Sequence, residues 1–292
     1  MITLREAINS KDFVITAELP LWPPRSRAAF ESDLRSLAQV ADAVHLGLDD
    51  RADSGVAPLA AASVALLAGI DPILHLHGRD KNRIALQSEI IGAAMIGVSS
   101  LVVRRGDKLP SMLRGRVKGV FDTKTTQLLS IANRVAEREE FSQSARLFIG
   151  CMVPPMRPNE EWEAALIQEK LDCGARFLQT RPIFNPDLLR EYASALVAQK
   201  ITHRARLLAG FPLLSSLSSA RSIGERHAGT TVPEPMIRRL SDAADSRAEA
   251  IEILAEQVEA AATTPGVSGV AIVNVDDVDA VVEAVKLADV VD

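Results

Sequence analysis

Polar side chains recur in this chain at one kind of position, the points where short apolar segments end. They comprise two acids, several imidazoles, an amide and a guanidinium: Glu18, His45, His75, His77, Asp107, Gln179 and Arg181. Acids can donate or accept protons, imidazoles can accept hydrogen bonds or bind a metal, and a guanidinium can bind anions. Any one of them could be a locally satisfied structural group, but the repeated position favours a shared functional site.

The segments that carry these residues alternate with helical patterns along the whole chain. The expected strands, which are short and rich in Val, Ile and Leu, are residues 13–19, 43–48, 72–78, 101–106, 146–153, 176–183, 206–213 and 270–275. The expected helices are residues 28–40, 56–68, 82–96, 125–139, 160–172, 186–198, 248–262 and 278–287. An eightfold alternation of this kind predicts an α/β fold, a single (β/α)8 TIM barrel over residues 1–292, with its site at the C-terminal ends of the strands.

The longest irregular stretch is residues 215–247, which contains Pro233-Glu234-Pro235. A connection of this length in a barrel is typical of a functional loop. We therefore expect a βα loop with one or two extra short helices, which forms a wall or lid of the site.

Composition limits the class of protein. The chain has 292 residues, 47% of them hydrophobic, with no linker-like segment, which favours one domain. A formal charge of −5 without a long basic run argues against nucleic acid as a partner. Two cysteines, no apolar run near membrane-spanning length and no signal-peptide pattern favour a soluble, cytoplasmic protein away from membranes. The sequence leaves open whether it is a homo-oligomer.

Several common site chemistries fit the sequence poorly. His75 and His77 share one face of a strand, and with His45 and Glu18 they could form the site of a metal-dependent barrel hydrolase. That ligand set is incomplete, because no further histidine follows on the later strands, so we expect no metal. Glycine-rich phosphate loops are also absent from the sequence. Neither Cys151 nor Cys173 belongs to a nucleophile motif.

An ordered series of motifs resembles the methylenetetrahydrofolate reductase family, and in particular a divergent bacterial branch of it. The motifs are Ala17-Glu18-Leu19, Pro23-Pro24-Arg25, His75-Leu76-His77, Arg105-Gly106-Asp107 and Lys170-Leu171-Asp172-Cys173-Gly174-Ala175, followed by residues 177–185, 210–215 and 230–236. The resemblance extends over residues 13–274. No single motif is specific, and the order and spacing carry the resemblance.

The resemblance implies reduction of 5,10-methylenetetrahydrofolate to 5-methyltetrahydrofolate by hydride from NADH or NADPH, through FAD or directly. It implies that Glu18 and Asp107 are catalytic: Glu18 is the acid that opens the folate ring, and Asp107 binds the pterin. It places His75, Arg105, Gly106 and Lys170 against the cofactor. The substrate contacts that it implies are Asp107, Gln179, Arg181 and Ile223.

Departures from the family pattern concern both ligands. Arg181 stands where the family has a folate-binding glutamine, and a guanidinium cannot accept a hydrogen bond. Residues 148–151 lack the family's flavin-facing tyrosine, and Glu169 stands where a basic residue would precede Lys170. We therefore expect weak or absent FAD binding. A folate-binding or methyl-transfer protein without redox activity stays open as an alternative, as does the metal-dependent hydrolase.

Overall fold

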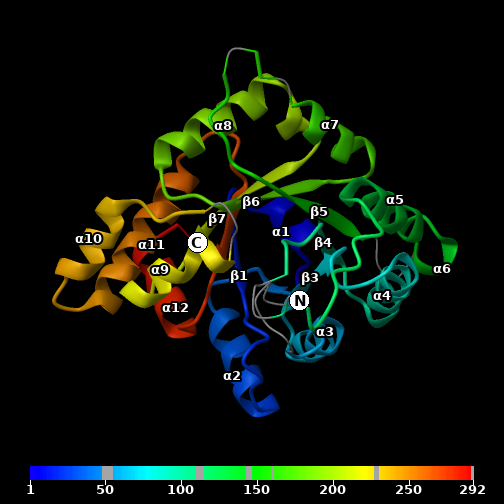
Figure 1. Ribbon diagram of the computed structural model, residues 1–292, viewed down its shortest axis with the longest axis horizontal. Coiled ribbons are helices and arrows are strands. Elements are labelled where there is room, and N and C mark those ends of the chain that lie inside the picture. The colour runs from blue at the N-terminus through cyan, green and yellow to red at the C-terminus, as the bar shows by residue number, and fades with distance from the viewer. Residues whose placement is uncertain are drawn as a thin grey trace.

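Eight parallel strands close into a barrel in the order β1-β2-β3-β4-β5-β6-β7-β8, and helices surround it (Figure 1). The computed structural model describes residues 1–47, 55–109, 113, 115–142, 147–159, 161–162, 164–226 and 230–290, without the side chains of residues 141–142 and 225–226. The predicted TIM barrel is confirmed. Parts of three expected elements, at residues 48, 146, 160 and 163, lie outside the described residues.

The observed elements agree with the expected ones to within a few residues at most ends. The strands are β1 (Val14–Glu18), β2 (Ala43–Leu46), β3 (Asp71–His77), β4 (Ser100–Arg104), β5 (Phe148–Val153), β6 (Phe177–Pro182), β7 (Arg206–Pro212) and β8 (Gly269–Val273). The outer helices are α2 (Arg27–Leu37), α3 (Pro58–Leu67), α4 (Arg83–Ile96), α5 (Thr125–Ala136), α6 (Glu139–Ser142), α7 (Ala165–Asp172), α8 (Pro186–Ala198), α11 (Ser246–Ala262) and α12 (Val278–Ala288). Side-chain caps fix several helix starts, including Asn82 on α4 and Asn185 on α8.

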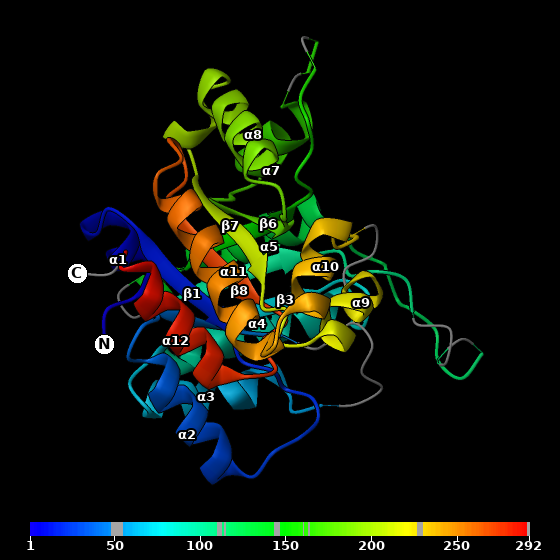
Figure 2. The ribbon, with the colours of Figure 1, turned by 90° about the vertical axis from the view of Figure 1, so that its left-hand side faces the viewer.

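A short helix that the sequence analysis did not predict, α1 (Leu4–Ser10), closes the N-terminal end of the barrel. Its side chains Leu4, Ala7 and Ile8 pack against the first inward-facing layer, which includes Phe148 and Phe177. Figure 2 shows α1 and both chain termini at one end of the barrel, with α9 (Leu217–Arg226) and α10 (Glu234–Asp242) at the other. Helix α1 therefore plugs the interior of the barrel at this end.

The expected extra helices after β7 are α9 and α10, and they form a wall beside the barrel mouth. Phe184, Leu214, Ile223 and Leu240 belong to a small apolar cluster that joins these helices to the loops after β6 and β7. The prediction of a helical βα loop is confirmed. No helix in the described part of the chain is long and apolar enough to cross a membrane.

A buried carboxylate, Asp71, ties the plug to the barrel. Its Oδ2 accepts a hydrogen bond from the backbone nitrogen of Leu4 at 2.8 Å, and Ser99 Oγ donates to its Oδ1 at 3.1 Å. Asp71 has no exposed surface, and burial raises the pKa of its carboxyl from 3.8 to about 6. Burial opposes ionisation more strongly here than the hydrogen bonds favour it.

This raised pKa makes stability depend on pH. The unfolded chain ionises Asp71 near pH 4 and the folded chain near pH 6, so its contribution to stability is complete below pH 4 and is lost as pH rises through about 6. Asp71→Asn does not titrate, so its stability relative to the wild type should rise by about 1 to 3 kcal/mol between pH 4 and pH 7. Urea unfolding at several pH values measures this. A constant difference between the two proteins would contradict the assignment, and the exposed Asp12→Asn serves as a control.

Candidate functional site

A cavity of about 760 Å³ opens at the barrel mouth between the ends of β4, β5 and β6. Its lining includes four cationic side chains, Arg104, Arg105, Lys170 and Arg181, and one carboxylate, Asp107. The cavity extends outward past Thr125 and Leu188 to the segment before α10. Volume and charge suit an anionic ligand of nucleotide size.

Asp107 and Arg181 are joined across the mouth. Arg181 Nη2 donates to Asp107 Oδ1 at 2.7 Å, and both side chains are partly exposed. Gly106 directs the chain into this position: its φ is +84°, and a Cβ there would come within 2.7 Å of the Cβ of Arg79. Only glycine combines that backbone angle with that approach. Gly106 therefore shapes the loop that holds Asp107, and a ligand that binds Asp107 must share it with Arg181 or displace it.

The other predicted cofactor-binding cations also reach this cavity. Lys170 comes from α7, and its Nζ donates to the carbonyl oxygen of Met152 at 3.1 Å, which anchors the ammonium at the end of β5. The guanidinium of Arg105 lies over the ring of Phe121, 5.3 Å from the centroid. Arg104 was not predicted, although the signal was present, because it lies two residues after the inward-facing Val102.

A chain of hydrogen bonds links four neighbouring strands, β8, β1, β2 and β3, and fixes the tautomers of two histidines. Thr16 Oγ1 donates to the carbonyl oxygen of Val270 at 2.8 Å, so it must accept from His45 Nε2, also at 2.8 Å. His45 Nδ1 is then an acceptor, and it receives the proton of His75 Nε2 at 2.9 Å. This network assigns the lone pair of His75 to Nδ1, which lies beside Gly47. His75 therefore offers a ligand an acceptor.

Burial keeps these imidazoles neutral. It lowers the pKa of His45 to about 3, and burial together with the neighbouring His45 lowers the pKa of His75 well below its ordinary value. Because His45 and His75 bond to each other, those ring nitrogens do not converge on a common point. Within the described residues, no group of three or more His, Cys, Asp or Glu side chains is arranged to hold a metal ion.

Glu18 is the last residue of β1, where its backbone pairs with His45 of β2, and the described lining of the cavity does not include it. Its Oε2 accepts a hydrogen bond from the backbone nitrogen of Asn274 at 2.8 Å. Asn274 has a left-handed φ of +58°, and its side-chain nitrogen donates to the carbonyl oxygen of Leu213 at 2.8 Å and to Ser219 Oγ at 3.0 Å. Asn274 thus orients the Glu18 carboxylate. It was not predicted, although it follows an apolar strand as Glu18 does.

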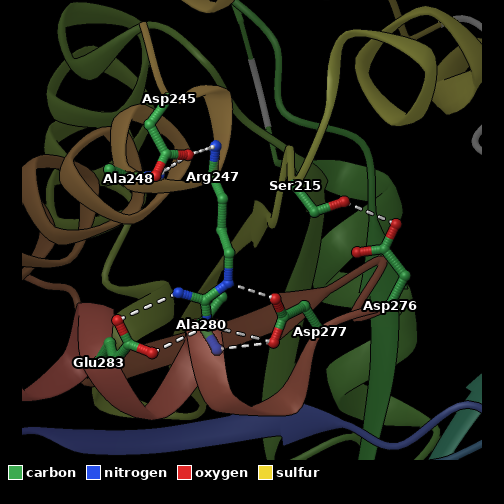
Figure 3. A network of polar contacts seen from close by, with 8 residues as sticks. All are labelled: Ser215, Asp245, Arg247, Ala248, Asp276, Asp277, Ala280 and Glu283. Carbon is green, nitrogen blue, oxygen red and sulfur yellow. Dashed lines mark hydrogen bonds and ion pairs between the residues drawn. The ribbon is translucent and has the colours of Figure 1, made fainter.

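Hydrogen bonds and ion pairs join residues of the segment after β7 to those that follow β8 (Figure 3). Ser215 donates to Asp276 at 2.7 Å, and Arg247 at the start of α11 bonds to Asp277 at 2.7 Å and to Glu283 at 2.8 Å. Individual exposed ion pairs contribute little to stability. Their effect here is geometric, because they fix the two loops whose ends position Asn274 and, through it, Glu18.

The two remaining predicted substrate contacts differ in their surroundings. Gln179 points into the barrel one layer below Arg181, is 1% exposed, and its Oε1 has no hydrogen-bond partner. A buried acceptor of this kind is free to receive a donor from a ligand or a bound water. Ile223 is also 1% exposed, but it belongs to the apolar cluster beneath α9. Its side chain faces protein in this structure and offers no surface to a substrate.

Aromatic residues are scarce around the mouth. Within the described lining of the cavity, Phe184 is the one aromatic residue. Phe148 stacks on Phe177 at the plugged end, 4.9 Å between centroids, and Tyr192 is buried in α8 beside Trp162. Cys151 is buried as well, and burial raises the pKa of its thiol to about 11. It is therefore protonated at neutral pH, in agreement with the absence of a nucleophile motif.

Comparison with protein families gives one match over nearly the whole chain. The family model described as methylenetetrahydrofolate reductase matches residues 3–288. No curated protein matches the chain.

Solved structures of low sequence identity share the fold. A chitinase from Chromobacterium violaceum is similar with a TM-score of 0.56 at 14% identity, over 96% of this chain and 100% of that one. A 2,3-dimethylmalate lyase has a TM-score of 0.53 at 14% identity, over 98% and 86%. A dihydropteroate synthase from Thermus thermophilus has a TM-score of 0.50 at 18% identity, over 94% and 93%. At these identities the similarity establishes the barrel alone.

Proposed function

Since the chain belongs to the methylenetetrahydrofolate reductase family, we propose that it reduces 5,10-methylenetetrahydrofolate to 5-methyltetrahydrofolate with hydride from NADH or NADPH. Family membership supports a reductase that acts on a folate. The observation that supports the specific reaction is the arrangement of two carboxylates, Glu18 at the end of β1 and Asp107 in the loop after β4, at one barrel mouth that also bears a cationic cavity.

The reaction assigns each carboxylate a different task. Transfer of a proton to N10 of the folate opens its five-membered ring and leaves an iminium between N5 and the methylene carbon; hydride from the nicotinamide then adds to that carbon. Glu18 is the proton donor to N10. Asp107 accepts hydrogen bonds from the amino-pyrimidine edge of the pterin and orients it. Protein side chains hold and aim the reactants, and the nicotinamide supplies the hydride.

Binding of the pterin involves the ion pair, because the pterin must share Asp107 with Arg181 or displace it. The aminopyrimidine edge and Arg181 compete for Asp107, because the guanidinium occupies one of the carboxylate oxygens at 2.7 Å. Arg181 can turn to an anionic group of either ligand, which a glutamine at this position could not bind as strongly. Gln179 below it offers its unpartnered Oε1 as a further acceptor.

The cavity suits the phosphates of FAD better than it suits the isoalloxazine ring. Arg105 and Lys170 can pair with the phosphates of FAD or of a nicotinamide dinucleotide. For an isoalloxazine ring the described lining offers no tyrosine or tryptophan, and Phe184 is nearly buried. The described lining therefore offers the ring no aromatic stacking face, and in the proposed reaction the nicotinamide passes its hydride directly to the folate.

We expect the protein to purify with little or no bound FAD. A flavin would need stacking surface in addition to phosphate contacts, and the cavity supplies mainly the latter. The visible spectrum of freshly purified protein, before and after dialysis, measures occupancy. NADH oxidation that depends on 5,10-methylenetetrahydrofolate in colourless protein is the expected result. Near-stoichiometric FAD that survives extensive dialysis would contradict it, and folate binding without any NADH or NADPH oxidation would favour a non-redox folate-binding protein.

A further inference from the structure

A second cavity, of about 580 Å³, lies at the opposite end of the barrel from the proposed reductase site. Four arginines and a histidine contribute to its lining: Arg5, Arg176, His203, Arg204 and Arg206. We call it the basic cavity. Catalytic sites of TIM barrels lie at the other end, so the reductase reaction gives these residues no role.

Strand pairing brings the arginines together. Arg206 is the first residue of β7 and pairs with Phe177 of β6, and its backbone nitrogen donates to the carbonyl oxygen of Arg176 at 3.0 Å. The short 3-10 helix Ile201–His203 leads into β7 and places His203 and Arg204 at the same edge. Arg5 reaches the cavity from α1, with its guanidinium 5.4 Å from the ring centroid of Phe148.

The arginines of the basic cavity differ in the groups that they bond. Arg204 pairs with Asp172 at 2.6 Å. Arg176, by contrast, donates to the carbonyl oxygens of Leu171 and Ala175 at 3.2 and 2.9 Å, and Arg206 donates to Asn9 Oδ1 at 3.4 Å. Within the described residues neither of these two guanidiniums contacts a carboxylate.

A structural role accounts for an individual arginine at this place: Arg176, for example, caps the C-terminal end of α7 through its hydrogen bond to the carbonyl oxygen of Leu171. Such roles do not explain the concentration of like charges on a chain whose net charge is −5, because the mutual repulsion of these arginines opposes folding unless an anion offsets it. Each guanidinium has five N–H donors, and the bonds of Arg176 and Arg206 use only one terminal nitrogen of each side chain. Donors are therefore left for a ligand.

We propose that the basic cavity binds a small molecule that carries at least two phosphate groups. Phosphate oxygens accept bonds from several directions, which matches guanidiniums that arrive from α1, from the residue before β6 and from β7, whereas a single carboxylate is satisfied by one arginine. The volume lies within the range of pockets for small organic ligands and exceeds what a lone ion requires. Phe148 adds an apolar wall.

Calorimetric titration with inorganic pyrophosphate at low ionic strength tests this proposal. The cavity at the mouth can also bind phosphates, so Arg105→Gln/Lys170→Gln serves as the background, because it removes the two mouth cations that we expect to pair with phosphates. In that background pyrophosphate should still bind and raise the melting temperature. Adding Arg176→Gln and Arg206→Gln should weaken this binding about tenfold or more, because each change removes charged hydrogen bonds.

A matched control removes the same charge elsewhere. Arg27→Gln/Arg190→Gln in the same background removes two exposed, locally paired arginines outside both cavities and should leave the affinity unchanged. The single Arg206→Gln variant guards against misfolding of the double variant, and it should show an intermediate affinity with an unaltered circular dichroism spectrum. Equal affinity in the Arg176/Arg206 variant and its parent, or an equal loss in the control, would overturn the proposal.

Discussion

Glu18→Gln should lower the rate of folate reduction at saturating substrate about 10²-fold or more, the usual scale for loss of a general acid. Glutamine retains an oxygen that can accept the hydrogen bond from the backbone nitrogen of Asn274, so the end of β1 should keep its structure. It has no proton to give to N10 of the folate. The loss should therefore appear in kcat and kcat/KM alike, while the affinity for NADH stays within about twofold.

Steady-state kinetics of the wild type and the variant measure this effect. Glu252→Gln, an exposed change of the same chemistry on α11, is the control and should be fully active. A Glu18→Gln enzyme with near-normal turnover at saturating folate would remove Glu18 from the mechanism.

Asp107→Asn should weaken folate binding about 10- to 100-fold and leave NADH binding nearly unchanged. The amide replaces one acceptor oxygen with a donor, which would face the N–H donors of the pterin edge, and hydrogen bonds to charged groups are worth about 1.5 to 3 kcal/mol. Direct titration of each ligand separates the two affinities.

Arg181 allows the cause of that loss to be identified. In an Arg181→Gln background the ion pair with Asp107 is already absent. If Asp107 contacts the pterin, Asp107→Asn should weaken folate binding in this background by about as much as it does in the wild type. If the loss occurs only when Arg181 is present, Asp107 acts by holding Arg181 rather than by binding folate. Equal weakening of folate and NADH would also count against the assignment.

The barrel could be predicted from the sequence because its strands are buried on both faces and its helices on one. Apolar runs such as residues 101–103 therefore stand out, and the observed β4 ends at Arg104, two residues before Gly106 with its positive φ. Helix α1 could not be predicted in this way. A local start signal was present, because Thr3 and Glu6 form a capping box, but seven residues are too few to show a helical period. The contact between Asp71 and the nitrogen of Leu4, which ties the helix to the barrel, joins residues far apart in the sequence.

The sequence predicted which residues belong to the site better than it predicted the contacts between them. Strand-end position identified Asp107 and Arg181, and their pairing at 2.7 Å follows only from the closure of the barrel. The same rule would have identified Arg104 and Asn274. Ile223 shows the opposite case, because the sequence placed it near the mouth, while packing of α9 turns its side chain into an apolar cluster. Whether a side chain in a long loop faces ligand or protein depends on contacts far away in sequence.

Transfer of a labelled hydride tests the central claim most directly. The purified protein is incubated with 5,10-methylenetetrahydrofolate and with NADH or NADPH that carries deuterium at the transferred position of the nicotinamide. The mass of the folate product is then measured by mass spectrometry. The proposed reductase predicts 5-methyltetrahydrofolate with one deuterium in its new methyl group, formed in step with oxidation of the dinucleotide and lost in Glu18→Gln. No 5-methyltetrahydrofolate above the level without protein, with either dinucleotide, would contradict the proposed function.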